Sequence, residues 1–219
     1  PAGRAAARGR LPAAARRLNA EVPVELARLA RARGARMIHV STDYVFPGTQ
    51  PPYGEDAPRE AVNVYGQTKL EGEQAVQAAG GAYLILRTSW VYSLRQGGFV
   101  TKVLQWAREQ ETLRIVDDQI SSPTWARMLA EATALIIAQG QNDPVGYLTE
   151  KAGLYHLAGS GACSRYEWAQ AILELDPKKS EQKVQQLLPA KSSAFPTPAE
   201  RPLVSVLECG KFEKTFGLR

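Results

Sequence analysis

The sequence predicts an α/β fold with a doubly wound parallel sheet and a small C-terminal α/β lobe. Residues 37–40 (MIHV) and 83–87 (YLILR) are short, largely apolar runs, which are typical of strands buried on both faces of a parallel sheet. Between them lies a stretch of helical character that follows Asn63, a favourable N-cap, and carries Leu70 and Val76. Strand and helix therefore alternate as parallel α/β proteins require.

The other elements follow in chain order, each with a local signal. Ser164 and Glu167 form a capping box that opens a helix ending near Leu175. Residues 47–62 are rich in Pro, Gly and acids and show no apolar period, so we expect a long loop that covers the cleft. We expect further helices over residues 22–33, after 97–99 as far as 108, over 125–138 and over 208–216, and further strands over 113–116, 154–158 and 184–188.

Composition excludes several classes of protein. The chain has 219 residues, of which 44% are apolar and 22% charged, the proportions of a soluble globular protein. No apolar run approaches the roughly 20 residues of a membrane span. Cys163 and Cys209 lie far apart without metal-ligand spacing, so we expect two structural thiols in a reducing cytoplasm. His39 and His156 lie in or beside strand-like runs without further ligands nearby, so we expect packed histidines and no metal site.

The net charge of +5 belongs to one end of the chain. Residues 1–36 hold nine of the 27 Lys and Arg but only two of the 22 Asp and Glu, so the remainder is close to neutral and indicates no nucleic-acid face. Residues 1–17 are rich in Ala and Arg and contain no acid. The lack of Ser there argues against a transit peptide, and the lack of aromatics argues against a nucleic-acid arm. We expect this segment to be a disordered, truncated or artefactual start.

Three polar side chains indicate reduction of a carbonyl group. Tyr65 and Lys69 are four residues apart and share a helix face, and Thr42 lies at a strand end, where open α/β sheets bind ligands. Hydride transfer to a carbonyl needs a proton donor such as Tyr, whose pKa a nearby ammonium lowers, and a hydroxyl that polarises the carbonyl. The same spacing recurs at Tyr147 and Lys151 among Asn, Pro and Gly, where we expect a surface loop without a catalytic role.

The sequence around these residues resembles one family closely. The motifs are residues 41–46 (STDYVF), 63–73 (NVYGQTKLEGE), 87–92 (RTSWVY), 118–119 (DQ), 122–124 (SPT), 153–158 (GLYHLA) and 196–202 (PTPAERP). They are similar to those of the dTDP-4-dehydrorhamnose reductases, which belong to the extended short-chain dehydrogenase/reductase superfamily. The similarity covers residues 18–219.

The resemblance implies a Rossmann-type fold and an oxidoreductase of dTDP-rhamnose biosynthesis. Such an enzyme reduces the C4 ketone of dTDP-4-dehydro-L-rhamnose to dTDP-L-rhamnose, with NADPH or NADH as cofactor, for bacterial surface polysaccharide. By this resemblance Tyr65 donates the proton, Lys69 lowers the pKa of Tyr65 and holds the nicotinamide ribose, and Thr42 polarises the carbonyl. Thr88, at the end of the second predicted strand, would contact the cofactor. Mg²⁺ occurs in the family, but no site for it is readable in this sequence.

The resemblance also assigns the partner and three further residues. Asp43 and Trp90 would contact the nucleotide sugar together with Thr42, and Arg201 would meet its diphosphate. The alternatives are a packed aromatic at Trp90 and a solvated or structural arginine at Arg201. We expect a cytoplasmic monomer or homodimer that binds a nucleotide sugar and neither nucleic acid nor membrane.

The sequence departs from the family on its N-terminal side. No glycine-rich turn of the form G-x-x-G-x-x-G or G-x-G-x-x-G follows a strand, so we expect the phosphate-binding half of the fold to be missing. We therefore expect a partial NAD(P)-binding domain over residues 18–158 and a substrate-binding lobe over 159–219 that is clipped at its C-terminal end. A sheet edge exposed in this way predicts poor solubility, which a monodisperse, cooperatively melting preparation would contradict. Gly98 stands where the family often has Asn, which puts one substrate contact in doubt.

Two alternatives to a working reductase remain. The first is a non-catalytic binding subunit similar to the regulatory β subunit of methionine adenosyltransferase, which shares the fold and much of the first two motifs. Retention of residues 87–90 (RTSW) favours the reductase. The second is an inactive fragment that lacks the grip on the cofactor phosphates.

Overall fold

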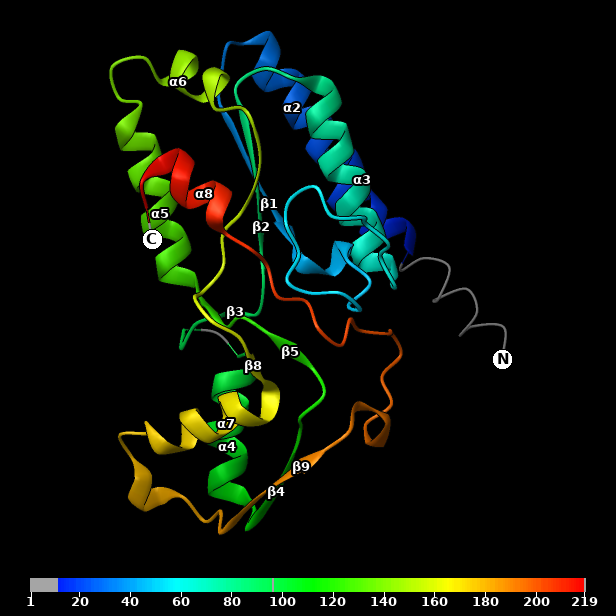
Figure 1. Cartoon of the computed structure of the whole chain (residues 1–219), viewed down its shortest axis with the longest axis vertical. Coiled ribbons are helices and arrows are strands. Elements are labelled where there is room, and N and C mark those ends of the chain that lie inside the picture. Colours follow the sequence, from blue (N-terminus) through cyan, green and yellow to red (C-terminus); the bar gives the residue numbers. More distant parts are fainter. Residues whose placement is uncertain (1–11, 96, 219) are drawn as a thin grey trace.

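The computed structural model describes residues 12–95 and 97–218, whose strands and helices form two lobes (Figure 1). The upper lobe contains a three-stranded sheet in the order β1-β2-β7, formed by β1 (Met37–Thr42), β2 (Tyr83–Thr88) and β7 (Gly153–His156). All three strands are parallel, and the register pairs Thr42 with Thr88 at the carboxyl ends of β1 and β2. The predicted parallel sheet is confirmed.

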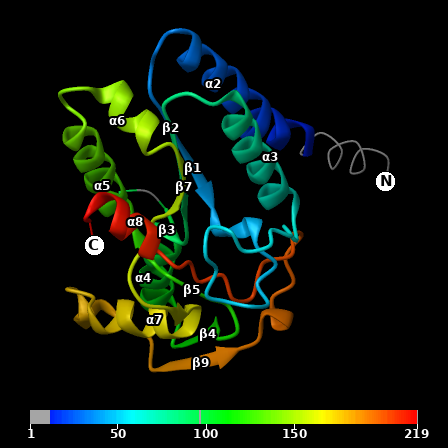
Figure 2. The ribbon, with the colours of Figure 1, turned by 45° about the horizontal axis from the view of Figure 1, so that its top comes forward.

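Helices cover both faces of this sheet, as Figures 1 and 2 show from two directions. One face carries α2 (Val22–Ala32) and α3 (Val64–Ala79), and the other carries α5 (Ala126–Gln139), α6 (Pro144–Glu150) and α8 (Gly210–Phe216). Successive side chains of β2 point to opposite faces of the sheet. Leu84 and Leu86 join the cluster of α5, α6 and α8, whereas Ile85 packs with Val76 of α3. Burial on both faces explains the unbroken apolar run of this strand.

The lower lobe combines two helices with a two-stranded parallel sheet. α4 (Phe99–Glu109) and α7 (Arg165–Glu174) pack with β4 (Thr112–Val116) and β9 (Gln186–Ala190). Their buried side chains form one hydrophobic cluster of Val103, Ala107, Leu113, Ile115, Ala169 and Leu173. α7 begins at the predicted capping box, where the Glu167 N–H donates to Ser164 Oγ over 3.1 Å and the Ser164 N–H donates to Glu167 Oε2 over 2.7 Å.

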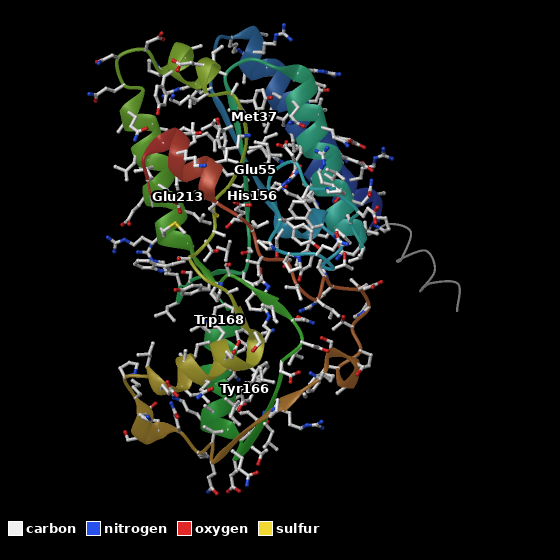
Figure 3. The ribbon with its side chains drawn as sticks, in the orientation of Figure 1. Met37, Glu55, His156, Tyr166, Trp168 and Glu213 are labelled. Carbon is white, nitrogen blue, oxygen red and sulfur yellow. The ribbon has the colours of Figure 1, made fainter. Side chains whose placement is uncertain are left out.

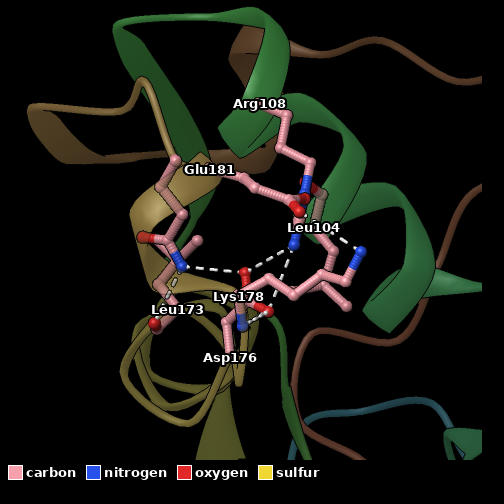
Figure 4. Close-up of polar contacts among 7 residues, drawn as sticks. Leu104, Arg108, Leu173, Asp176, Lys178 and Glu181 are labelled. Atoms are coloured by element: carbon pink, nitrogen blue, oxygen red, sulfur yellow. Dashed lines mark hydrogen bonds and ion pairs between the residues drawn. The ribbon is translucent and has the colours of Figure 1, made fainter.

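Polar contacts close the far end of the lower lobe (Figure 4). Arg108, near the end of α4, donates to Asp176 over 3.0 Å and to Glu181 over 2.9 Å. The side-chain amide of Gln182 donates to the same Asp176 and to the carbonyl of Leu173, both over 3.0 Å. Since Asp176 and Glu181 follow α7, this network joins the C-terminal ends of α4 and α7.

Several short elements were not predicted. β3 (Val91–Tyr92) pairs in parallel with β6 (Thr124–Trp125), and β5 (Ile120–Ser121) pairs antiparallel with β8 (Cys163–Ser164). Two-residue strands show no periodicity, so their positions depend on tertiary packing rather than on a local pattern. The remaining short helical turns are η1 (Arg17–Glu21), η2 (Asp43–Val45), η3 (Lys179–Glu181) and η4 (Ser192–Ala194).

The lobes divide the chain differently from the boundary expected after residue 158. α4 and β4 precede that boundary but belong to the lower lobe. α8 follows it but packs on the upper sheet, where Phe212 and Phe216 join the cluster of Leu84 and Leu86. The chain passes between the lobes more than once, so no single boundary separates them.

Residues 12–17 are helical, contrary to the expectation of a disordered start. Residues 12–16 are helical and lead directly into η1, and the remaining residues of that segment, 1–11, lie outside the described part of the chain. Alanine-rich composition favours helix. Arg16 also forms an ion pair with Glu71 of α3 over 2.9 Å, which ties this helix to the upper lobe.

Tyr147 lies in helix α6 and not in a loop. Asp143 accepts the N–H of Gly146 and caps the helix, and Pro144 occupies its first position, so the residues that suggested a loop are in fact helix-start signals. Within the described residues, no helix combines the length and the apolar character that spanning a bilayer would require.

Candidate active site

Strands β1 and β2 end side by side, and buried polar residues stand at both ends. Thr42 and Thr88 are direct neighbours in the register, and Asp43 and Ser89 follow them. These four residues line a small cavity of about 340 Å³. Its other lining residues are Val40, Ser41, Tyr44, Tyr65, Trp90, Val91 and Arg165. The structure therefore gathers Thr42, Asp43, Tyr65, Thr88 and Trp90, all of which the sequence singled out, around one cavity.

The first turn of α3 brings Tyr65 to this small cavity. The side chain of Asn63 accepts the Gly66 N–H over 2.8 Å, so α3 begins at the predicted cap. A Cβ atom at Gly66 would overlap the carbonyl of Tyr44, so only glycine allows α3 to approach η2 this closely. The ring of Tyr65 then packs edge-on against Tyr44, with 5.9 Å between centroids.

The phenol of Tyr65 is held in its protonated form. Its ring is half exposed, but burial of the hydroxyl raises the pKa of Tyr65. The neighbouring Thr42 hydroxyl lowers that pKa in part, and the nearby charge of Asp43 raises it further. A neutral phenol beside a hydroxyl suits donation of a proton to an oxygen in the cavity.

Lys69 is not among the groups that shift the pKa of Tyr65 in this structure, so the effect expected of Lys69 stays a prediction. The Lys69 ammonium donates to the carbonyl of Val40 over 2.5 Å and lies 3.5 Å from His39 Nε2. Burial lowers the pKa of Lys69, and the charge of Glu73 partly offsets this effect. The helix does place Lys69 on the face of Tyr65. The end of its flexible side chain, however, turns toward the backbone of β1.

Asp43 is a buried carboxylate held by hydroxyl groups. Ser205 donates to Asp43 Oδ2 over 2.5 Å, Ser121 lies 3.4 Å from the same oxygen, and Thr42 donates to Oδ1 over 3.1 Å. Burial raises the pKa of Asp43 to about 6, although these hydroxyl groups counteract it. The sequence predicts that Asp43 contacts substrate. The structure shows it at the cavity, with both oxygens already bonded within the chain.

Trp90 separates the small cavity from a larger one. Its φ of 38° is in the left-handed region, which is rare for a residue with a bulky side chain and is found mainly at functional sites. Its indole stacks on Trp168 with 5.6 Å between centroids. The larger cavity has about 820 Å³, and its lining includes Trp90, Phe99, Lys102, Trp106, Arg165 and Arg201. Gly98 lines this cavity as well.

Arg165 is the residue at the site that the sequence reasoning missed. It lines both cavities, and its guanidinium carbon lies 3.7 Å from the centroid of the Trp90 ring. Its only local signal is its position directly after Ser164, the cap of α7. That position places it on a helix start without predicting which ring it will meet.

A buried polar network lies behind the strand ends. Glu73 of α3 accepts two hydrogen bonds from Arg87 of β2 and one from Ser41 of β1, the last over 2.5 Å. Arg87 Nη1 also lies 3.3 Å from Nε2 of the His156 ring on β7, and the backbone N–H of His156 donates to Glu55 Oε1 over 3.0 Å. Figure 3 shows Glu55 and His156 together in the middle of the upper lobe.

The network gives the loop over residues 47–62 a role different from the one expected. None of its residues lines either cavity. Glu55 instead anchors the loop to β7, and Tyr53 stacks on Phe46 with 4.3 Å between centroids. The prediction of packed, hydrogen-bonded histidines is confirmed for His156, which is completely buried.

The small cavity has polar groups on its wall of the kind that would bind one end of the expected nicotinamide cofactor. The hydroxyl of Thr88 is buried and has no hydrogen-bond partner among the residues that the structure describes, so a ligand amide or hydroxyl could satisfy it. Tyr65 supplies a second polar group on the same cavity wall. Among the described residues, no three His, Cys, Asp or Glu side chains are grouped as a metal ion would require.

Comparison with known proteins points to a single family. The family described as "RmlD substrate binding domain" matches residues 7–219. The dTDP-4-dehydrorhamnose reductase of Salmonella typhimurium is 40% identical over 209 residues, which cover 94% of this chain and 68% of the relative. The reductase of the same name from Burkholderia thailandensis is 39% identical over 211 residues, with 94% of this chain and 70% of the relative covered.

Solved structures agree with these matches. A dTDP-4-dehydrorhamnose reductase from Clostridium acetobutylicum superposes with a TM-score of 0.79 at 33% identity, over 90% of this chain and 65% of that one. The enzyme of the same name from Bacillus anthracis, in complex with NADP, gives a TM-score of 0.74 at 30% identity, with 90% and 65% covered. The chain thus spans about two thirds of the length of the proteins it matches.

Proposed function

Because the chain belongs to the RmlD substrate binding domain family, we propose that it carries the catalytic residues and the sugar-nucleotide site of a dTDP-4-dehydrorhamnose reductase. The reaction is reduction of the C4 ketone of dTDP-4-dehydro-L-rhamnose to dTDP-L-rhamnose. The observation that carries the proposal is the small cavity in which Thr42, Tyr65 and Thr88 meet, which shares Trp90, Val91 and Arg165 as lining residues with the larger cavity.

Tyr65 and Thr42 act on the carbonyl oxygen. Tyr65 gives its proton to the oxygen as negative charge develops there, and its raised pKa keeps the phenol protonated until that moment. Thr42 donates a hydrogen bond to the same oxygen and stabilises the developing charge. For this step the Thr42 hydroxyl exchanges the hydrogen bond that it donates to Asp43 Oδ1 for one to the substrate oxygen. When bound, NADPH or NADH supplies the hydride.

Thr88 and Lys69 bind the cofactor in this proposal. Thr88 lines the small cavity, and its buried hydroxyl would form a hydrogen bond with a polar group of the nicotinamide end. Lys69 contacts the ribose and exchanges its bond to the Val40 carbonyl for this contact. The relative from Bacillus anthracis was solved with NADP, which supports a nicotinamide nucleotide for this chain.

The larger cavity holds the nucleotide portion of the substrate. It has the volume of a cofactor-sized site and contains aromatic rings for a base and cations for phosphates. Arg201 stands on its wall and meets the diphosphate, and Trp90 contacts the sugar where the two cavities join. The proposal includes action in the cytoplasm as a monomer or homodimer on this small-molecule substrate, without a nucleic-acid or membrane partner. The two free thiols, Cys163 and Cys209, support the reducing compartment.

The test is turnover of the keto sugar by the purified chain with NADPH or NADH, with the product identified by mass spectrometry. Tyr65→Phe should lower kcat by about 100-fold or more, because the proton donor is lost. Tyr147→Phe is the matched control, since Tyr147 also precedes a Lys by four residues but lies outside both cavities. Wild-type activity in Tyr65→Phe would contradict the proposal. So would the absence of product when the keto sugar nucleotide and the nicotinamide cofactor are both bound.

A further inference from the structure

Arg165 lies at the junction of the two cavities, and no carboxylate of residues 12–95 and 97–218 forms an ion pair with it. Its guanidinium carbon lies 3.7 Å from the centroid of Trp90, 4.9 Å from that of Phe99 and 5.6 Å from that of Trp168. Within the part of the chain that the structure describes, its side chain makes no ion pair or hydrogen bond. Figure 3 shows Trp168 at the top of the lower lobe, facing the upper one.

Arg87, which is completely buried, has a carboxylate partner, since it pairs with Glu73 over 2.7 Å. The partly exposed Arg108 also pairs with a carboxylate, that of Asp176, over 3.0 Å. A cation shielded from water is costly unless an anion compensates it, so a largely enclosed arginine without one indicates a ligand. Asp43 interacts with Arg165 only at longer range, because its own oxygens are bonded to Ser205 and Thr42.

A second cation stands close to the first. Arg165 and Arg201 repel each other, and both act on the hydroxyl of Tyr44. Burial lowers the pKa of Arg165 to about 10, and Arg201 adds to this effect, whereas Tyr44 and Asp43 oppose it. Two arginines that repel one another at one cavity wall are stabilised together by an anion with two or more negative charges.

We propose that Arg165 binds the diphosphate of the nucleotide-sugar substrate together with Arg201, while stacking on Trp90 orients its guanidinium. The stack uses the face of the guanidinium and leaves its N–H edge free, which is the edge that binds phosphate oxygens in pairs. Since Arg165 lines both cavities, a diphosphate bound there leaves the nucleoside in the larger cavity and the sugar in the small one. This inference rests on the proposed function, because it assigns a binding position to the sugar nucleotide of that reaction.

The pyrophosphate of the cofactor has the same chemistry as that of the substrate, so the test must separate the two. Isothermal titration calorimetry with the full chain measures binding of thymidine diphosphate, of thymidine and of NADPH. Arg165→Gln should weaken binding of thymidine diphosphate by about tenfold or more and leave the affinities for thymidine and NADPH unchanged. Arg165→Lys keeps the charge but not the paired N–H groups, so it should fall between wild type and Arg165→Gln.

Arg127→Gln is the matched control. Arg127 also stacks on an indole, 5.5 Å from the centroid of Trp125, but it pairs with Glu131 and lines neither cavity. The Arg127→Gln variant should bind thymidine diphosphate, thymidine and NADPH as wild type does. Thermal melting of each variant checks that the fold is retained.

Three other binding results would overturn the inference. Equal losses for thymidine and thymidine diphosphate would mean that Arg165 acts only through the packing of Trp90. A selective loss of NADPH would assign it to the cofactor, and a wild-type chain that does not bind thymidine diphosphate would remove the basis of the inference. Because the assay needs no turnover, a selective loss in a chain that fails to reduce the sugar would support the inference while the proposed function fails. If Arg165→Gln binds thymidine diphosphate as tightly as wild type does, in a chain that reduces the sugar, the inference fails while the proposed function stands.

Discussion

Glu73 and Arg87 form a completely enclosed ion pair directly behind the strand ends that carry Thr42 and Thr88. Arg87 Nε and Nη2 donate to the two carboxylate oxygens over 2.9 and 2.7 Å. Arg87 precedes Thr88 on β2, and Glu73 follows Lys69 by one helical turn on α3. This pair therefore sets the position of the helix that carries Tyr65 relative to the strands.

Arg87→Met should lower the free energy of unfolding by about 3–5 kcal/mol, because it leaves the buried Glu73 charge uncompensated. The double variant Glu73→Leu/Arg87→Met should lose less than the two single variants together, since neither charge then remains. Urea denaturation measures both. Arg127→Met is the control, because the pair of Arg127 with Glu131 is exposed and should contribute less than about 1 kcal/mol. Equal losses in the two arginine variants would contradict the role given to the pair.

Asp43 should make the protein less stable as the pH rises. Its pKa in the folded chain is raised to about 6 from an ordinary 3.8, so the folded state binds its proton more tightly than the unfolded state does. The stability that the raised pKa of Asp43 contributes to the folded state is complete below about pH 4 and is lost as the pH rises through about 6. The stability of wild type relative to Asp43→Asn should therefore fall by on the order of 2–3 kcal/mol between pH 4 and pH 7. Chemical denaturation at a series of pH values checks this, and a pH-independent difference would contradict it.

His156 should act in the opposite direction. Burial, together with the positive charge of Arg87, lowers its pKa to about 3 from an ordinary 6.5. The neutral form is therefore favoured in the folded state, and the stability it contributes is present above pH 6.5 and lost as the pH falls. Relative to His156→Asn, the wild type should lose about 1.4 kcal/mol for each pH unit below 6.5. The same denaturation series tests it, and a slope with the sign found for Asp43 would be inconsistent with a neutral buried imidazole.

The part of the site that could be predicted depends on local patterns. The cap at Asn63, the spacing of Tyr65 and Lys69 and the apolar runs that end at Thr42 and Thr88 are all readable within a few residues, because helix caps and strand periodicity are local properties. They suffice to place α3 beside the ends of β1 and β2.

The remainder depends on contacts between distant segments. Ser205 and Asp43 are 162 positions apart, and nothing near either residue indicates the other. The meeting of Arg165 with Trp90 and the turn of Lys69 toward Val40 are likewise decided by which neighbours share a cavity wall. A flexible side chain takes its direction from the assembled fold, so its helix position alone does not predict its partner.

Gly66→Ala should disturb the site through the backbone. Its Cβ would overlap the Tyr44 carbonyl, which cannot move without shifting η2 and the end of β1. We expect a loss of about 1–3 kcal/mol in the free energy of unfolding, together with a lower kcat. Gly97→Ala is the control for stability, since a Cβ there meets no atom within 4 Å. A Gly66→Ala variant as stable and active as wild type would show that α3 and η2 can separate freely.

Thr42→Val should raise the pKa of Tyr65 and lower kcat. The Thr42 hydroxyl is the contact that lowers this pKa against burial and the charge of Asp43, and valine keeps the shape of the side chain while removing the hydroxyl. An ultraviolet difference titration, with Tyr65→Phe subtracted to isolate one phenol, should show Tyr65 ionising at higher pH in Thr42→Val than in wild type. Thr42→Ser retains the hydroxyl and should titrate as wild type does.

The kinetic effect of the same change separates two roles of Thr42. If the hydroxyl also polarises the substrate carbonyl, kcat should fall by about 100-fold in Thr42→Val, more than a change in the pKa of Tyr65 alone would cause, because the phenol is already protonated at neutral pH. A higher pKa of Tyr65 with an unchanged kcat in Thr42→Val would mean that Thr42 acts only on the pKa of Tyr65 and does not polarise the substrate carbonyl. An unshifted titration would mean that the contact between Thr42 and Tyr65 does not persist in solution, and the pairing of these two residues as the catalytic unit would then be wrong.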